Sequence, residues 1–215
     1  MDVEGGTMSG RKPYASPLRE AEAAATRARI VDAAAKLFVR DGYAATSLKA
    51  IAAAAGVSVQ TVNLHGPKHA LLAAAYERAL ADREGWASLN DTDPMQQIIA
   101  EPDPERLIAM YAAFMTAANA RIAALLRTLR AAADADPAVR DVYAAIDERR
   151  LRSIREGVAL LAARGVVPAD RSDDATALVT MLVSTDTYLH FREAGWSAER
   201  YREWLAAELR RAVAG

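Results

Sequence analysis

One short stretch, residues 48–62, constrains the fold of this chain more than any other. Ile51 and Ala52 occupy the inward positions of a predicted short helix, and the small side chain of Ala52 lets a second helix approach closely. Gly56 provides a sharp turn, because glycine readily adopts the positive φ that such a turn requires. Val62 then returns to the core from a second short helix. This spacing predicts a helix-turn-helix unit.

A longer amphipathic helix is predicted immediately before this unit. Ile30, Ala34, Leu37 and Phe38 follow the i, i+4, i+7, i+8 spacing of one buried stripe. Gly42 is well placed to end this helix. A unit of this kind places its last helix in the major groove of DNA. The segment therefore predicts a DNA-binding domain.

The outward side of the third predicted helix is polar. Ser58 can cap the helix, and Gln60, Thr61 and Asn63 follow it. All four carry short polar side chains that can bond base edges or phosphates. The alternative is an ordinary corner between two helices with polar residues on its wet face. The three-helix context favours the DNA-binding interpretation.

Residues 27–72 as a whole resemble the DNA-binding domain of the TetR family of one-component regulators. The resemblance rests on the predicted helix-turn-helix and on the residues around it. The matching residues are Ala34, Leu37, Phe38, Gly42, Tyr43, Thr46, Ser47, Ile51, Ala52, Ala55, Gly56, Val57, Ser58, Thr61, Lys68 and Leu71.

The resemblance implies roles for individual residues. Thr46 and Ser47 begin the second helix and touch the DNA backbone, the third helix reads the groove, and Lys68 binds phosphate near the start of the fourth helix. From the pattern and the resemblance together, the predicted DNA-contacting residues are Thr46, Ser47, Ser58, Gln60, Thr61, Asn63, His65 and Lys68.

Two positions depart from the family pattern. Asn63 stands where the family usually has a tyrosine, and the phenylalanine that commonly follows the position of His65 is missing. Asn63 can bond adenine or a phosphate instead, so altered specificity and weakened binding are both open. His65 can contact a phosphate or simply end its helix. The missing phenylalanine is expected to shorten or tilt the connection into the fourth helix.

The composition of the chain predicts an all-α protein. Helix-forming residues dominate, and only 6% of the residues are aromatic. No apolar stretch is expected to be long enough to cross a bilayer, so we expect no membrane partner. The chain has no cysteine, which fits a reducing cytoplasm and excludes disulfides and thiolate metal sites. We expect a cytoplasmic protein without a metal site or cofactor.

The predicted organisation has about nine helices in two domains. A flexible arm over residues 1–17 precedes the three-helix DNA-binding domain, residues 18–66. Residues 67–215 follow as a helical ligand-binding and dimerisation domain. Its first part, residues 67–89, is predicted as a connecting helix because proline is favoured at a helix start.

The second domain is rich in alanine, with larger side chains spread sparsely along its predicted helices. At helical spacing these larger residues are first of all core residues. Small alanine faces can also leave room for an apolar ligand between the helices. On that interpretation the candidate ligand-binding residues are Trp86, Tyr111, Met115 and Asn119.

The last two predicted helices each carry an apolar stripe. These stripes are either buried within one chain or paired with a second copy in a four-helix bundle. The resemblance favours the homodimer, and two half-sites also strengthen operator binding. The candidate interface residues are Leu178, Met181, Leu182, Thr185 and Leu189 on one helix and Tyr201, Trp204, Leu205 and Leu209 on the other.

The charge of the chain is distributed unevenly. Residues 1–68 contain nine Lys and Arg against six Asp and Glu, whereas the remainder contains eighteen against twenty-two. This asymmetry suits a chain that contacts phosphate at one end only. No motif of a catalytic site is present, so we expect no catalytic residues and no enzyme.

These features together predict a transcriptional regulator that binds double-stranded operator DNA as a homodimer. We expect a repressor that a largely apolar small molecule releases from a palindromic operator. The alternative is a TetR-like helical ligand-binding protein with weakened or lost DNA binding, which the two departures near Asn63 would favour.

Overall fold

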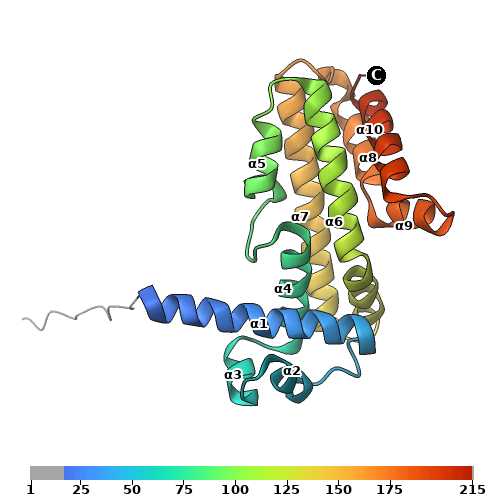
Figure 1. Ribbon diagram of the computed structural model, residues 1–215. Helices are drawn as coiled ribbons and strands as arrows, with labels where there is room; N and C mark the ends of the chain where they lie inside the picture. Colours follow the sequence, from blue (N-terminus) through green and yellow to red (C-terminus); the bar gives the residue numbers. More distant parts are fainter. Residues whose placement is uncertain (1–16, 215) are drawn as a thin grey trace, which may run out of the picture.

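The computed structural model describes residues 17–214, and the predicted all-α class is confirmed (Figure 1). The predicted arm over residues 1–17 lies outside the described residues, apart from Pro17. Ten α-helices run through the described part: α1 Pro17–Asp41, α2 Leu48–Ala55, α3 Val59–Leu64, α4 Lys68–Ala81, α5 Asp93–Ile99, α6 Pro104–Ala133, α7 Pro137–Ala163, α8 Ser172–Leu182, α9 Thr185–Glu193 and α10 Ala198–Ala214. Two short 3₁₀ helices, Leu89–Asp91 and Ala169–Arg171, lie in the connections.

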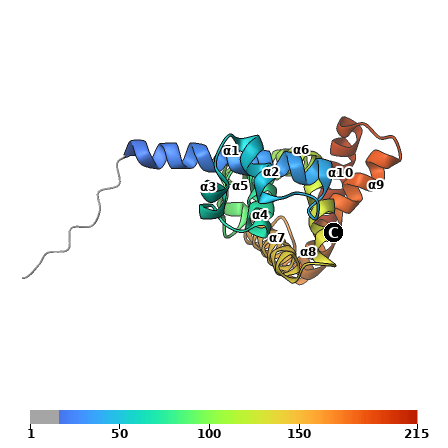
Figure 2. The ribbon, with the colours of Figure 1, turned by 90° about the horizontal axis from the view of Figure 1, so that it is seen from below.

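The first three helices form a head at one end of the molecule. α1 lies across the long axis of the other helices, and α2 and α3 sit on its far side (Figures 1 and 2). The side chains of Ile30, Phe38, Ile51 and Val62 are fully buried and form the core of this head. Gly56 ends α2 in the left-handed conformation, with φ of 67°. The turn between α2 and α3 therefore forms as its sequence predicts.

The remaining helices α5–α10 form the body, and α4 joins it to the head. The long helices α6 and α7 run side by side, and α6 also packs against α4 and α10 (Figure 1). By length and composition α6 could cross a membrane, contrary to the expectation that no stretch of the chain is long enough. Half of its most apolar window is buried inside the protein, so it serves as a core helix.

Two helix boundaries differ from the predictions, and the second of them raises the number of α-helices in the described residues from about nine to ten. The connecting helix α4 ends at Ala81, not near Leu89, because Asp82 adopts the left-handed conformation. The first of the last two predicted helices, which carries the stripe from Leu178 to Leu189, is interrupted after Leu182. Ser184 caps a new helix there by accepting a hydrogen bond from the backbone nitrogen of Thr187 at 3.1 Å.

Candidate DNA-contacting face and ligand cavity

The start of α3 is fixed by hydrogen bonds between its own residues. The Ser58 hydroxyl accepts a hydrogen bond from the backbone nitrogen of Thr61 at 3.0 Å and lies 2.8 Å from the Thr61 hydroxyl. Val62 anchors the inner side of the helix in the core of the head. Two of the predicted contact residues therefore hold the helix in shape, and their hydroxyls are already engaged.

The outer side of α3 presents Gln60 and Asn63, as predicted, and also two apolar residues that the sequence analysis did not select. Val59 and Leu64 are exposed, and Leu64 keeps 81% of its surface open to solvent. The predicted DNA contacts on α3 are all polar side chains, which left these two residues out. The signal was present, because both residues lie at outward positions next to Gln60 and Asn63.

Thr46 and Ser47, predicted to touch the DNA backbone, have different environments. Ser47 is exposed and caps α2 by accepting a hydrogen bond from the backbone nitrogen of Ala50 at 3.1 Å. Thr46 is only 2% exposed, and its hydroxyl donates to the carbonyl oxygen of Gly42 at 2.7 Å. Thr46 therefore braces the turn between α1 and α2 and presents no surface to a phosphate.

His65 at the end of α3 and Lys68 at the start of α4 both form contacts within the head. His65 ends α3, and its carbonyl oxygen accepts a hydrogen bond from the Arg27 side chain of α1. The Lys68 ammonium group donates to the carbonyl oxygen of Tyr43 at 2.9 Å and lies 4.1 Å from the centre of the Tyr43 ring. Lys68 and His65 are both half-exposed, so each can approach DNA while it holds the head together.

All four candidate ligand-binding residues line one cavity in the body. Its volume is about 110 Å³, and a second cavity of about 70 Å³ shares the wall formed by Asn90, Met95, Tyr111, Ser153 and Ile154. The second cavity is lined mainly by aliphatic side chains. The first cavity combines apolar residues with polar ones, and its lining includes Tyr76, Trp86, Tyr111, Met115, Asn119, Arg130, Tyr143, Arg150, Thr185 and Asp186.

The buried side-chain amide of Asn119 forms two hydrogen bonds to residues that also line the cavity. It donates to the carbonyl oxygen of Val183 at 3.1 Å and accepts from the Thr185 hydroxyl at 2.8 Å. It thereby ties α6 to the break between α8 and α9. Thr185, predicted at the dimer interface, instead belongs to this buried network and to the cavity wall.

Charged and phenolic groups also face the first cavity. The Arg130 guanidinium binds the Asp186 carboxylate at 2.5 and 2.9 Å, and this contact lowers the pKa of Asp186. Burial raises the pKa of both Tyr76 and Tyr111 to about 12. Neither tyrosine hydroxyl forms a hydrogen bond within residues 17–214. Two uncharged hydroxyls therefore remain as donors and acceptors in a mostly apolar site.

A buried ion pair connects the cavity wall to α4. The Glu77 carboxylate of α4 binds the Arg149 guanidinium of α7 at 2.5 Å and accepts from the backbone nitrogen of Gly85 at 2.8 Å. Arg149 also donates to the carbonyl oxygen of Trp86 at 3.1 Å and stacks over its ring at 4.7 Å. Trp86, which faces the cavity, is thus held between α4 and α7.

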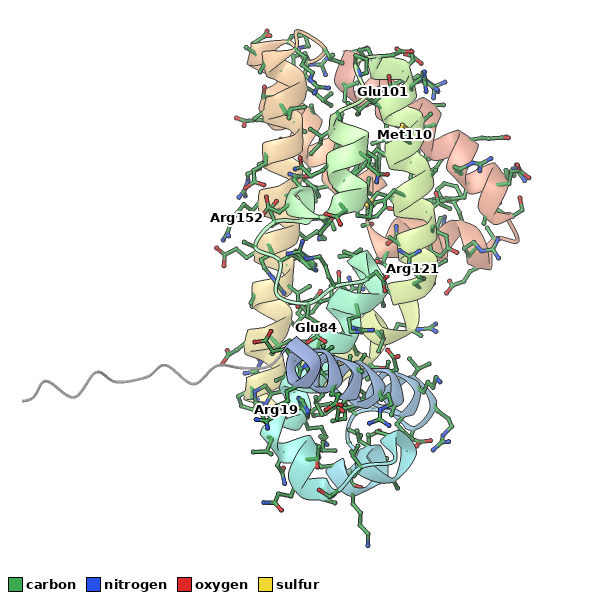
Figure 3. All side chains as sticks on the ribbon, turned by 60° about the vertical axis from the view of Figure 1, so that its left-hand side comes forward. Arg19, Glu84, Glu101, Met110, Arg121 and Arg152 are labelled. Atoms are coloured by element: carbon green, nitrogen blue, oxygen red, sulfur yellow. The ribbon has the colours of Figure 1, made fainter. Side chains whose placement is uncertain are left out.

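The loop that carries Trp86 also contacts the head, through Glu84. The Glu84 carboxylate binds the Arg27 guanidinium of α1 at 2.8 and 3.0 Å, and Arg27 also donates to the His65 carbonyl oxygen at the end of α3. Figure 3 shows Glu84 beside α1, where the head meets the rest of the molecule. The backbone of residues 84–86 and the polar contacts of Glu84 and Arg27 therefore link the cavity wall at Trp86 to the end of α3.

Most of the predicted dimer-interface residues lie in the chain's own core. Tyr201, Leu205 and Leu209 are almost fully buried, and the Tyr201 hydroxyl donates to the carbonyl oxygen of Leu182 at 3.2 Å. Leu182 and Thr185 are buried as well. These five cannot also present a surface to a second chain. Of the predicted interface residues, only the exposed Leu178 and Met181 and the half-buried Leu189 and Trp204 keep surface that a second chain could cover.

Comparison with known proteins agrees with this geometry. The model of the family described as bacterial regulatory proteins, tetR family, matches residues 30–75. No curated protein matches the chain in sequence. The fold is similar to that of a protein from Mesorhizobium loti described as a TetR-family transcriptional regulator, with a TM-score of 0.65 and 22% identity over 89% of this chain and 96% of that one.

Two further solved structures share the fold. One, from Rhodococcus sp., is also described as a TetR-family regulator and gives a TM-score of 0.67 at 17% identity, over 88% of this chain and 99% of that one. The other is a transcriptional regulator from Saccharomonospora viridis in complex with choline, with a TM-score of 0.63 at 18% identity, over 85% and 94%. Residues 30–75 therefore form a TetR-family helix-turn-helix domain, on a chain with the all-α fold of TetR-family transcriptional regulators.

Proposed function

We propose that this protein is a ligand-responsive repressor that binds a palindromic operator as a homodimer. The observation that carries the proposal is the free outer side of α3, where Gln60 and Asn63 point away from the chain's own core. A short helix held this way by caps at its start and a core residue on its inner side can enter the major groove. One such helix makes few base contacts, so two copies are needed for tight binding.

The cavity supports the ligand-responsive part of the proposal. Its mixed lining suits a small, largely apolar effector that carries one or two polar groups. An effector that displaced Trp86 would also move Arg149 and the loop that carries Glu84. Because Glu84 holds Arg27 and Arg27 holds the end of α3, the head would change its position. The two heads of a dimer would then no longer fit both half-sites.

Operator binding is tested with duplex DNA from the region next to the chain's own coding sequence. We expect a retarded band in a gel-shift experiment and a steep loss of affinity with salt, because phosphate contacts release counterions. With four contacted phosphates the affinity should fall roughly 50-fold between about 0.1 and about 0.3 M salt. Affinity that is independent of salt would contradict the proposal.

The proposed dimer uses the exposed apolar residues of α8. Leu178 and Met181 lie at i and i+3 on one face of that helix, and 56% of the Met181 surface is exposed. We expect Met181→Glu to convert the dimer to a monomer, because a charge would then be buried in an apolar interface. Sedimentation velocity measures the change. Val39→Glu, at an exposed apolar position of α1, is the matched control and should leave the dimer intact.

A second candidate function is a helical ligand-binding protein that no longer binds DNA. It is favoured by Asn63 and by the missing phenylalanine after His65, since both changes remove aromatic packing next to α3. This candidate predicts no retarded band with any duplex, together with ordinary ligand binding in the cavity. The gel-shift experiment therefore separates the two functions.

A further inference from the structure

The outer side of α3 is unusual in combining amides with apolar side chains. Val59, Gln60, Asn63 and Leu64 are all exposed, whereas Val62 between them is fully buried. Residues 59 and 63 are neighbours on the helix surface at i and i+4, and so are residues 60 and 64, so that the two pairs lie side by side. The four side chains therefore form a single outward surface, which we call the reading surface.

No cation belongs to the reading surface. Between Leu48 and Pro67 the basic residues are Lys49, which lies on α2, and His65, which ends α3. Lys68 is already bound to the carbonyl oxygen and the ring of Tyr43. Guanine is most often read by Arg or Lys, which donate two hydrogen bonds to its O6 and N7 atoms. The reading surface therefore lacks the side chains that select G·C pairs.

The groups that are present match an A·T pair instead. An asparagine or glutamine amide can bond both N6 and N7 of adenine, and an aliphatic side chain can contact the C5 methyl group of thymine. Gln60 and Asn63 form no side-chain hydrogen bond within residues 17–214, so their amides are free to do so. Leu64 is 81% exposed, and contact with thymine methyl groups would remove its apolar surface from water.

We propose that the reading surface selects A·T pairs at the centre of each operator half-site. Asn63 and Gln60 bond adenine, and Leu64, supported by Val59, packs on thymine methyl groups. This inference rests on the proposed function, because it requires that α3 enters the major groove. It goes further in naming the DNA sequence class and in making Leu64 a specificity-determining residue.

The first experiment selects duplexes from a randomised pool with the full-length protein. We expect A·T pairs at the positions under α3 in every enriched half-site. The enriched duplex is then prepared with deoxyuridine in place of thymidine, which removes only the C5 methyl groups. Each methyl group that Leu64 covers should contribute about fourfold in affinity.

The second experiment compares variants on the two duplexes. Leu64→Ala should bind the thymidine duplex more weakly and should lose most of its sensitivity to deoxyuridine. Asn63→Ala should lose about tenfold or more in its preference for A·T over G·C at one position, while it keeps its deoxyuridine sensitivity. Val39→Ala, which shortens an exposed aliphatic side chain of α1, is the matched control and should behave as the unaltered protein.

The outcomes distinguish this inference from the function on which it rests. If no duplex is bound at any salt concentration, both the regulator function and the inference are overturned. If G·C-rich duplexes are enriched, the regulator function stands and the inference is overturned. If A·T-rich duplexes are enriched but Leu64→Ala keeps full sensitivity to deoxyuridine, the role assigned to Leu64 is overturned.

Discussion

Replacing Glu77 by alanine is expected to lower the free energy of unfolding by about 3 kcal/mol. The Glu77 carboxylate is the partner of the Arg149 guanidinium at 2.5 Å, and both side chains are largely buried between α4 and α7. The substitution would leave a buried positive charge whose Nε atom already lacks a hydrogen-bond partner within the described residues. It would also free the backbone nitrogen of Gly85. Urea denaturation at neutral pH measures the change.

Two further variants identify the cause of that loss. Glu148→Ala removes a carboxylate of the same helical body whose ion pair with Arg152 is exposed, and it should change stability by less than about 0.5 kcal/mol. Glu77→Leu combined with Arg149→Met removes both charges and should recover much of the lost stability. A Glu77→Ala variant as stable as the unaltered protein would contradict a structural role for this ion pair.

Alkaline pH is expected to destabilise the protein strongly between pH 10 and pH 12. Burial raises the pKa of Tyr76 and Tyr111 from the ordinary 10.0 to about 12. Below pH 10 both tyrosines are protonated in the folded and the unfolded chain, so stability does not depend on them. Above pH 10 the unfolded chain releases these protons while the folded chain retains them, and the free energy of unfolding falls. Tyr76 alone should account for about 2 kcal/mol by pH 12.

The tyrosine origin of this loss can be checked residue by residue. Tyr76→Phe should leave the free energy of unfolding at pH 8 almost unchanged, because the Tyr76 hydroxyl forms no hydrogen bond within the described chain. The substitution should also reduce the fall in the free energy of unfolding above pH 10. Denaturation at a series of pH values, together with tyrosinate absorbance, gives both quantities. An equally steep decline in Tyr76→Phe would assign the alkaline transition to other groups.

The elements of the head are predictable from the sequence because their signals are local. The turn after α2 requires the left-handed conformation that Gly56 adopts. Ser58 caps the next helix and Val62 packs in the core, all within a few residues. Val59 and Leu64 lie outside the predicted set because only polar side chains were expected to contact DNA. Thr46 was predicted on the DNA because a sequence does not show that its hydroxyl turns inward to Gly42.

The body was harder to predict because its decisive contacts join distant residues. The apolar stripe that contains Tyr201 and Leu205 indicated a buried face but not the surface that covers it, and the covering surface proved to be the same chain. The four candidate ligand residues do line one cavity, and whether they bind a ligand remains a prediction. The end of α4 was predicted too late in the chain, because the sequence shows neither the left-handed conformation of Asp82 nor the hydrogen bond from Gly85 to Glu77.

The sequence by itself determined the all-α class, the helix-turn-helix and the polar part of the reading surface. These follow from helix periodicity, caps and turn residues that act within about one or two helical turns. Only the tertiary structure decided which apolar faces are covered, where a cavity remains, and how Glu84 and Arg27 join the cavity wall to α3. Those contacts link residues far apart in the chain, such as Arg27 and Glu84, which lie 57 positions apart. Periodicity shows that a face is buried without showing what it is buried against.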